Sequence, residues 1–171
     1  DDKVVLALPP SGTTQLLPEI AAPTETRAIV NGHFRLGHEV ELPGGNRLLG
    51  LIGGTAHWLF ARGDIASVTV SAADELAAKE ADEIAQLLWR DVAQALGKPP
   101  SEPPPYRIVK EKRATFAQIP AALAKRPPPR TAYENLFLAG DWTDTGLPAT
   151  IEGAVLSGQR AAALALAAQR R

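Results

Sequence analysis

The fold is decided by one stretch near the C-terminal end, residues 135–162, which reads NLFLAGDWTDTGLPATIEGAVLSGQRAA. Its first part, Leu136–Leu138, is a short apolar run that predicts a buried strand. The small residues Ala139 and Gly140 then end the strand and leave room for a ligand close to the backbone. Asp141 follows at the C-terminal tip of the strand, where open α/β sheets hold their ligands. A carboxylate at this place can accept hydrogen bonds from sugar hydroxyls.

A helix is expected after the loop that follows this strand. Pro148 suits the opening of a helix, and the first turn would then hold Thr150, Ile151 and Glu152. The free N–H groups of a first turn stabilise negative charge on a ligand. Small residues give the helix a smooth face for close packing, namely Gly153, Ala154, Ser157, Gly158, Ala161 and Ala162. A strand, a polar turn and a helix that bind no ligand would show the same pattern, so the residues alone leave both interpretations open.

The N-terminal end of the chain repeats the pattern of a buried strand. Val4–Leu8 is a continuous apolar run that two prolines close, which is typical of a strand buried on both faces. We expect residues 4–8 to pair with residues 136–140, or to lie beside them, in one sheet.

Between these two strands the chain first has the pattern of a sheet. Apolar and polar residues alternate between residues 27 and 70, and clusters such as Pro43–Asn46 interrupt them. This pattern predicts about four antiparallel strands joined by short turns, a meander. A further strand is expected over residues 106–116.

A helical segment follows the meander. Apolar residues recur at spacings of three and four and predict a helix over residues 82–96. Upstream, Ser71–Asp74 has the spacing of a capping box. Gly97 stands where a C-terminal cap belongs, and the proline-rich residues 99–105 predict a stiff extended connector.

The composition excludes several classes of site. The 171 residues include 18 basic and 19 acidic side chains, which give a net charge of −1 and argue against nucleic-acid binding. Without cysteine there can be no disulfide, thiolate nucleophile or iron–sulfur cluster. The chain has three histidines, so a histidine-rich metal site is not expected, and we predict no metal.

The first residues indicate a piece of a longer polypeptide. The chain opens with Asp1 and Asp2, contains no methionine, and shows no charged-then-apolar signal peptide. Its longest apolar run, residues 161–168, is shorter than the roughly 20 residues that span a bilayer. We therefore expect a fragment without a membrane span.

The order of residues in the stretch 135–162 resembles the C-terminal flavin motif of amine oxidases, protoporphyrinogen oxidases and carotenoid desaturases. The shared pattern is a strand, Ala-Gly, an acid, a loop and then Glu-Gly-Ala-x-x-Ser-Gly. The resemblance implies FAD as cofactor, with Asp141, next to Gly140, at the ribityl and phosphate region. It also implies that Ala149, Thr150 and Ile151 contact the pyrimidine edge through their backbone, where a reduced flavin carries negative charge.

Three segments narrow the resemblance to the squalene-associated branch, the bacterial hydroxysqualene dehydroxylases. They are residues 140–154 (GDWTDTGLPATIEGA), 112–116 (KRATF) and 53–58 (GGTAHW), and the likeness extends over essentially the whole chain. It implies that reduced FAD removes the hydroxyl of hydroxysqualene and yields squalene and water in hopanoid biosynthesis. A phytoene or carotenoid desaturase, or an amine oxidase, is the alternative enzyme. A non-catalytic lipid-binding or scaffold protein is the alternative of another class.

The resemblance also implies the fold class, α/β with mixed α+β character. Residues 1–10 and 131–171 would be the C-terminal pieces of an FAD-binding lobe, and residues 11–130 a substrate lobe with the antiparallel meander and the helix. The family binds the FAD pyrophosphate with an N-terminal G-x-G-x-x-G turn, which this chain lacks. We therefore expect an incomplete FAD site and an inactive isolated fragment. Its partner would be the missing N-terminal FAD-binding segment of the same polypeptide.

The expected substrate is an apolar polyprenoid. Phe34, Trp58 and Phe60 could line its tunnel, with a place in the core as the alternative. We assign no catalytic residue, because histidines in strands, such as His33 and His57, are more often structural. A group of basic residues is expected to form a solvated face, with contact to anionic membrane lipid as the alternative: Lys110, Lys112, Arg113, Lys125, Arg126 and Arg130. The expected location is the cytoplasm, with peripheral contact at the inner face of the bacterial membrane.

Overall fold

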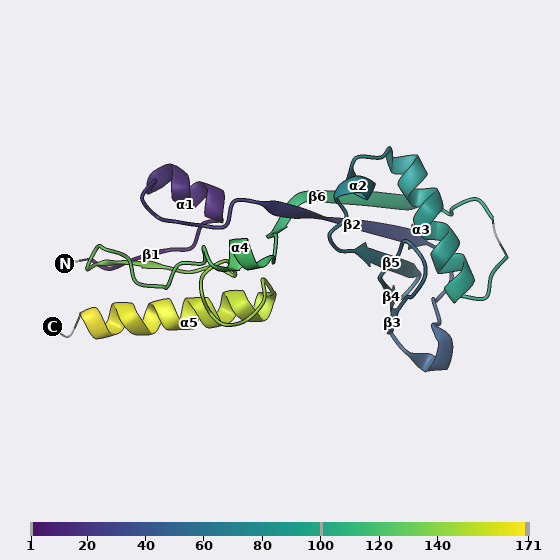
Figure 1. The fold of residues 1–171 in the computed structure, drawn as a ribbon. Helices are drawn as coiled ribbons and strands as arrows, with labels where there is room; N and C mark the ends of the chain where they lie inside the picture. The colour runs from purple at the N-terminus through teal and green to yellow at the C-terminus, as the bar shows by residue number, and fades with distance from the viewer. Residues whose placement is uncertain (1, 100, 170–171) are drawn as a thin grey trace. The chain divides into compact units, whose positions relative to one another are not determined.

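The computed structural model describes residues 2–99 and 101–169. The chain forms two compact units (Figure 1). Unit 1 combines the chain up to Thr26 with the chain from Thr115 onward, and unit 2 is Arg27–Ala114. Helices and strands are both present, with one parallel and one antiparallel arrangement, so the predicted mixed α/β class is confirmed.

Unit 2 is built on a five-stranded sheet with the order β3-β4-β5-β2-β6. Its strands are β2 (Thr26–Arg35), β3 (Leu48–Gly50), β4 (Trp58–Arg62), β5 (Ile65–Val70) and β6 (Tyr106–Phe116), with a short 3₁₀ turn, η1 (Pro43–Gly45), before β3. Adjacent strands β3, β4 and β5 pair antiparallel, and β5 also pairs antiparallel with β2. The four predicted antiparallel strands and the strand over residues 106–116 are confirmed. The predicted meander holds for β3, β4 and β5 alone, because β2 pairs with β5 and not with β3, the next strand along the chain.

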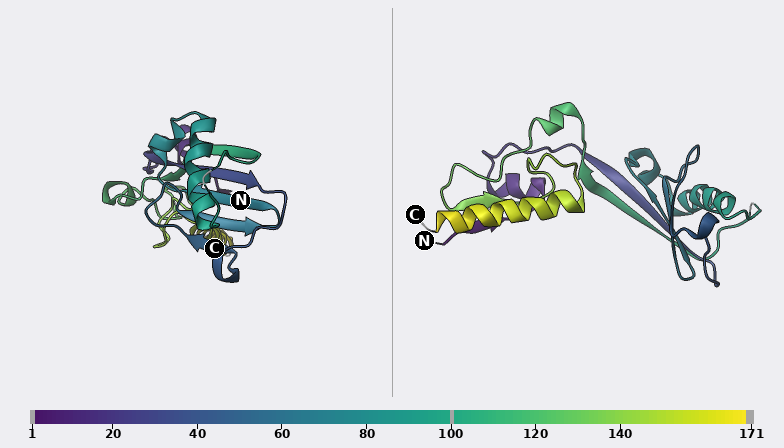
Figure 2. Two further views of the ribbon diagram at one scale, coloured as in Figure 1. Left: turned by 90° about the vertical axis from the view of Figure 1, so that its right-hand side faces the viewer. Right: turned by 90° about the horizontal axis from the view of Figure 1, so that it is seen from below.

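Two helices, α2 (Asp74–Ala77) and α3 (Ala81–Ala95), pack on one face of this sheet. In Figure 2, left, α3 crosses the strands. Ile84, Leu88 and Val92 are fully buried in one core with alternate residues of β2, β4 and β5, as the period of two in the strands requires. A Cβ on Gly32 would lie 2.9 Å from Leu88 Cδ1, so a residue without a side chain lets the helix approach the sheet.

The predicted helix over 82–96 is confirmed, and so is its C-terminal cap. Gly97 adopts a φ of +63°, and the N–H groups of Lys98 and Gly97 donate to the carbonyls of Ala93 and Gln94, at 2.8 and 3.1 Å. This is a Schellman motif, which satisfies carbonyls that the helix end leaves open.

The predicted capping box at Ser71–Asp74 is wrong. The N-cap of α2 is Ala73, and no side chain caps the helix. The Asp74 carboxylate instead accepts a hydrogen bond from Ala28 N at 2.9 Å, and it lies 3.6 Å from Arg27 Nε. Asp74 is thus used to attach the helix to β2, a role that depends on a strand 46 residues away.

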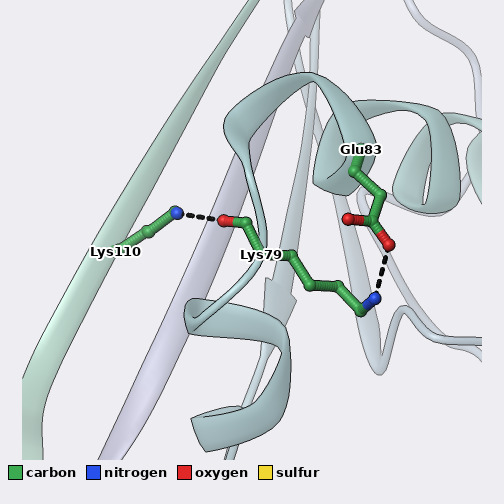
Figure 3. A network of polar contacts seen from close by, with 3 residues as sticks. All are labelled: Lys79, Glu83 and Lys110. Atoms are coloured by element: carbon green, nitrogen blue, oxygen red, sulfur yellow. Dashed lines mark hydrogen bonds and ion pairs between the residues drawn. The ribbon is translucent and has the colours of Figure 1, made fainter.

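The junction between α2 and α3 is also attached to the edge strand β6 (Figure 3). Lys110 of β6 donates from Nζ to the backbone carbonyl of Lys79, and the Lys79 ammonium pairs with Glu83 one helical turn later. Lys110 is half-buried. Its role here is to hold the junction to the sheet.

Unit 1 contains a parallel pair of strands, β1 (Val4–Leu6) and β7 (Leu136–Leu138), in the register Val4↔Leu136 to Leu6↔Leu138. The predicted neighbourhood of residues 4–8 and 136–140 is confirmed across about 130 residues of sequence. The prediction that the first strand is buried on both faces is wrong, because Val4 and Val5 are 45% and 43% exposed. The described sheet has two strands, so β1 is an edge strand with one neighbour.

Three helices complete unit 1: α1 (Pro10–Leu16), α4 (Pro120–Leu123) and α5 (Ile151–Ala168). The long helix α5 runs beside β1 and β7 (Figure 2, right). Phe137, Ala139 and Ala161 form one small core under it, and Leu138 and Trp142 belong to a second core. No helix among the described residues is both long and apolar enough to cross a membrane.

The boundaries of the compact units differ from the predicted lobe boundaries. Residues 11–26 and 115–130, expected in the substrate lobe, lie in unit 1 with the N- and C-terminal strands. The reason is packing: Ala22, Phe116 and Ala122 share a buried core with the residues that surround β7.

Candidate functional site

The candidate site is the turn between β7 and α5, and Gly140 begins it. Gly140 adopts a φ of +146°, and a Cβ at this position would lie 2.5 Å from Trp142 Nε1. The indole of Trp142 is buried against the backbone and donates from Nε1 to Leu8 O at 2.9 Å. A glycine is therefore required for the chain to turn over the indole ring.

Asp141 follows at the C-terminal tip of β7, where it is half-buried. Burial raises the pKa of its carboxyl above the ordinary value, while the Arg126 guanidinium and the backbone N–H groups of Asp141 and Trp142 act in the opposite direction. Taking a carboxylate out of water disfavours its charged form, and a nearby cation favours it. The site thus presents a partly desolvated acceptor beside a fixed positive charge.

The turn after Asp141 is bound by Arg126. Its guanidinium donates to the backbone carbonyls of Leu147 at 2.7 Å and Asp141 at 3.0 Å, to the carbonyl of Thr143, and to Thr145 Oγ1 at 3.3 Å. Its carbon Cζ lies 5.5 Å from the centroid of the Phe116 ring. The sequence interpretation placed Arg126 on a solvated basic face. In the structure Arg126 is hydrogen-bonded to the turn instead. Its partners are backbone carbonyls, and a sequence pattern does not show which carbonyls a side chain will reach.

Gln118 holds the end of the same turn. Its Oε1 accepts a hydrogen bond from Ala149 N at 3.1 Å, and Ala149 is buried. Ala149 was predicted to reach the flavin through its backbone. In this structure its N–H is already engaged by Gln118, so a contact of that N–H with a ligand would require the amide side chain to move.

The helix α5 begins at Ile151, three residues after Pro148, and Thr150 is its N-cap. Thr150 Oγ1 accepts a hydrogen bond from Gly153 N at 3.1 Å. The predicted opening at Pro148 is therefore displaced: Pro148 lies in the turn, and its carbonyl would be 2.6 Å from a Cβ on Gly153. Close packing of the turn against the helix start fixes where the helix begins.

Ile151 and Glu152 carry the first free amides of this helix. Within the described residues their backbone N–H groups have no hydrogen-bond partner, as expected for the first turn of a helix. Both residues are exposed, Ile151 to 87%. These two N–H groups are available to an anion or to an electron-rich edge of a ligand.

One side of α5 packs against β7. Of the predicted smooth face, Gly153, Ser157 and Ala161, spaced by four, are buried. Gly158 is half-buried, and Ala154 and Ala162 are exposed, so the packed face is narrower than predicted. Ser157 Oγ accepts a hydrogen bond from Gly140 N at 2.7 Å and donates to Ala154 O at 2.6 Å. This serine joins the helix to the glycine that starts the turn.

The predicted contact residues of the cofactor lie on the connection between β7 and α5 and at the start of that helix: Gly140, Asp141, Ala149, Thr150 and Ile151. The turn offers a half-buried carboxylate at one end and free helix amides at the other. A flavin needs acceptors for its ribityl hydroxyls and donors for its N1–C2=O edge, and this donor and acceptor set fits both.

The predicted substrate-lining residues are not brought together. Phe34 is fully buried in the core, where its ring centroid lies 5.4 Å from that of Trp89. Trp58 and Phe60 lie on the other face of the sheet and are 47% and 40% exposed. Phe34 is on the buried face together with Leu59, and Trp58 and Phe60 on either side of Leu59 point to the opposite face. Phe34 therefore cannot share a surface with Trp58 and Phe60.

His33 in β2 and His57, directly before β4, both make structural hydrogen bonds. His33 Nδ1 lies 2.9 Å from Ser67 Oγ on the neighbouring strand, and His57 Nδ1 accepts a hydrogen bond from Ser71 N at 3.2 Å. Over the residues that the structure describes, no group of three or more His, Cys, Asp or Glu side chains could hold a metal ion.

Comparison of the sequence with known proteins identifies relatives among flavin proteins. A family model described as flavin containing amine oxidoreductase matches residues 1–166. A hydroxysqualene dehydroxylase of Sinorhizobium fredii is 52% identical over 166 residues, 97% of this chain and 39% of that protein. Another from Rhodopseudomonas palustris is 51% identical over 170 residues, 99% of this chain and 40% of its own length.

More distant similarity is confined to part of the chain. A 15-cis-phytoene desaturase of Narcissus pseudonarcissus is 43% identical over 54 residues, 32% of this chain and 10% of that protein. The chain spans about 40% of the length of the hydroxysqualene dehydroxylases that it matches.

Proposed function

The chain belongs to the flavin-containing amine oxidoreductase family, and we propose that it forms the flavin-edge part of an FAD-dependent hydroxysqualene dehydroxylase. The observation that carries the proposal is the connection between β7 and α5, which has Asp141 at its beginning and leads into the free amides of the α5 start. The identity to proteins named hydroxysqualene dehydroxylase, which extends over 96% or more of this chain, supports the choice of reaction.

In this proposal Asp141 accepts a hydrogen bond from a ribityl or sugar hydroxyl of FAD. The amides of Ile151 and Glu152 face the pyrimidine edge, where the helix start stabilises negative charge. Gly140 supports this arrangement by letting the backbone turn over the Trp142 indole, which fills the space that a side chain would take. When bound in reduced form, FAD would supply the hydride that replaces the hydroxyl of the substrate, and one proton would be needed for that hydroxyl to leave as water.

The substrate would be an apolar polyprenoid. Trp58 and Phe60 support this part of the proposal, because two exposed aromatic side chains on one face of a sheet form an apolar surface. Leu48, paired with Phe60 across β3 and β4, is 46% exposed and extends the same surface. Phe34 is left out of this surface, since it is a core residue.

We also propose the partners and the location that go with this function. The pyrophosphate of FAD would be bound by an N-terminal segment of the same polypeptide. The protein would work in the cytoplasm and touch the inner face of the membrane, because its substrate partitions into lipid. Co-sedimentation of full-length protein with vesicles of phosphatidylglycerol and phosphatidylethanolamine tests the membrane contact.

The proposed function is tested with full-length protein in two assays: hydroxysqualene with reduced FAD, and phytoene with oxidised FAD and an electron acceptor. We expect squalene from the first and no desaturated product from the second. Desaturation of phytoene would instead favour the alternative that the 54-residue match supports. Protein that binds no FAD and converts neither substrate would point to the non-catalytic alternative, a lipid-binding or scaffold protein.

A further inference from the structure

We propose that Arg126 is a positioning residue of the flavin site: it holds the turn 141–147 in the shape that presents Asp141 to the cofactor. The inference deepens the proposed function and rests on it. Arg126 does not belong to the strand–turn–helix motif, and it precedes Asp141 by 15 residues.

The contacts of Arg126 run along the whole turn. The guanidinium donates to carbonyls at its start, middle and end, namely those of Asp141, Thr143 and Leu147. It also donates to Thr145 Oγ1, and that hydroxyl in turn accepts a hydrogen bond from Leu147 N at 3.2 Å. A planar group with five N–H donors can serve several acceptors from one position, which an ammonium cannot do with the same geometry.

The guanidinium is itself fixed in place. The guanidinium lies over the ring of Phe116 in a cation–π contact, and Phe116 is buried in a core with Ala122 and Leu138. Backbone bonds secure the segment on both sides, since Arg126 N donates to Leu123 O at 3.1 Å and Asp144 N donates to Pro127 O at 2.8 Å. Arg126 therefore links the turn to the buried core and fixes the position of the turn relative to that core.

The charge of Arg126 also acts on Asp141. In the described part of the chain, Arg126 is the one charged side chain that opposes the effect of burial on the Asp141 carboxyl. Without it the carboxyl would be neutral up to a higher pH, and a neutral carboxyl is the weaker acceptor for a hydroxyl. Arg126 would thus keep both the position and the ionisation of the group that binds FAD.

The experiment uses full-length protein and compares three variants. Arg126→Gln removes both the charge and the planar group, whereas Arg126→Lys keeps the charge alone. Lys125→Gln, at the exposed neighbouring position, is the matched control. FAD is titrated into each apoprotein between pH 5 and pH 9, and amide hydrogen exchange is followed in the absence of FAD.

We expect Arg126→Gln to raise the FAD dissociation constant about ten- to a hundredfold, Arg126→Lys to raise it less, and Lys125→Gln to leave it within about twofold. Exchange at Asp144 and Ala149 should become faster in Arg126→Gln while the amides of α3 stay protected. Burial already raises the pKa of Asp141, and loss of the arginine raises it further. Affinity for FAD should therefore fall at a higher pH in Arg126→Gln than in wild type.

The outcomes separate this inference from the proposed function. Wild-type affinity and pH dependence in Arg126→Gln would overturn the role of Arg126 and leave the proposed function intact. Wild-type protein that binds no FAD would overturn the proposed function, and this role with it. If Arg126→Gln does not fold, Arg126→Lys decides: unchanged affinity there would show that the planar group is not needed.

Discussion

The two units of the chain are stabilised in different ways. Unit 2 has one continuous apolar core between a five-stranded sheet and α3. Unit 1 has a two-stranded sheet and two small cores, and its turn is held by single polar side chains from distant segments. A two-stranded sheet is marginal by itself. The difference teaches that the proposed site depends on a few specific bonds, while the sheet unit depends on buried area.

The largest expected effect breaks the core of unit 2. Leu88→Ala should lower the free energy of unfolding by about 2–5 kcal/mol, because a fully buried leucine is lost and a cavity remains. Urea denaturation followed by circular dichroism measures it. Gln86→Ala, exposed on the same helix, should change stability by about 0.5 kcal/mol or less. Equal effects of the two substitutions would show that the core of unit 2 is loosely packed.

The next effect concerns binding at the turn of unit 1. Asp141→Ala in full-length protein should raise the FAD dissociation constant about ten- to a hundredfold, the equivalent of one charge-assisted hydrogen bond of roughly 1.5–3 kcal/mol. Asp144→Ala, exposed in the same turn, is the control and should change affinity far less. Thermal melts accompany the titrations. A lower melting temperature with unchanged FAD affinity would make Asp141 a structural turn residue.

A third substitution tests how tightly the turn of unit 1 is built. Gly140→Ala should cost about 1–3 kcal/mol of stability, because its φ of +146° is unfavourable for alanine and the new Cβ meets the Trp142 indole. Gly158→Ala in α5 is the matched control: its Cβ would enter open space, and we expect a gain of roughly 0.5–1 kcal/mol. Urea denaturation compares the two, and a neutral Gly140→Ala would mean that the turn relaxes freely.

The smallest expected effect is at the start of α5. Thr150→Ala removes the side chain that accepts from Gly153 N and should cost about 1 kcal/mol. Thr150→Ser, which keeps the hydroxyl, should retain most of the stability. Thermal unfolding of both variants checks the prediction. A cost shared equally by Thr150→Ser would assign the effect to the lost methyl group and not to the cap.

Patterns within short windows predicted much of the fold correctly. The apolar stripe of residues 82–96 predicted α3, and Gly97 predicted the cap of that helix. The alternation of apolar and polar residues in β2 and β5 predicted the antiparallel strands. Each of these depends on neighbours within a few residues, so their physical cause is present in the local sequence. The capping box failed for the opposite reason, because the partner of Asp74 is Ala28 on a strand far along the chain.

Local sequence patterns were enough to predict the family, the strand–turn–helix motif and the place of residues 140–151 between the strand and the helix. Only the tertiary structure decided that Arg126 and Gln118 hold this turn, that Trp142 lies beneath Gly140, and that Phe34 is a core residue while Trp58 is exposed. The physical reason is range. Backbone periodicity and helix starts are set by adjacent residues, whereas the partner of a guanidinium, an amide or an indole is set by where the packed core carries distant segments.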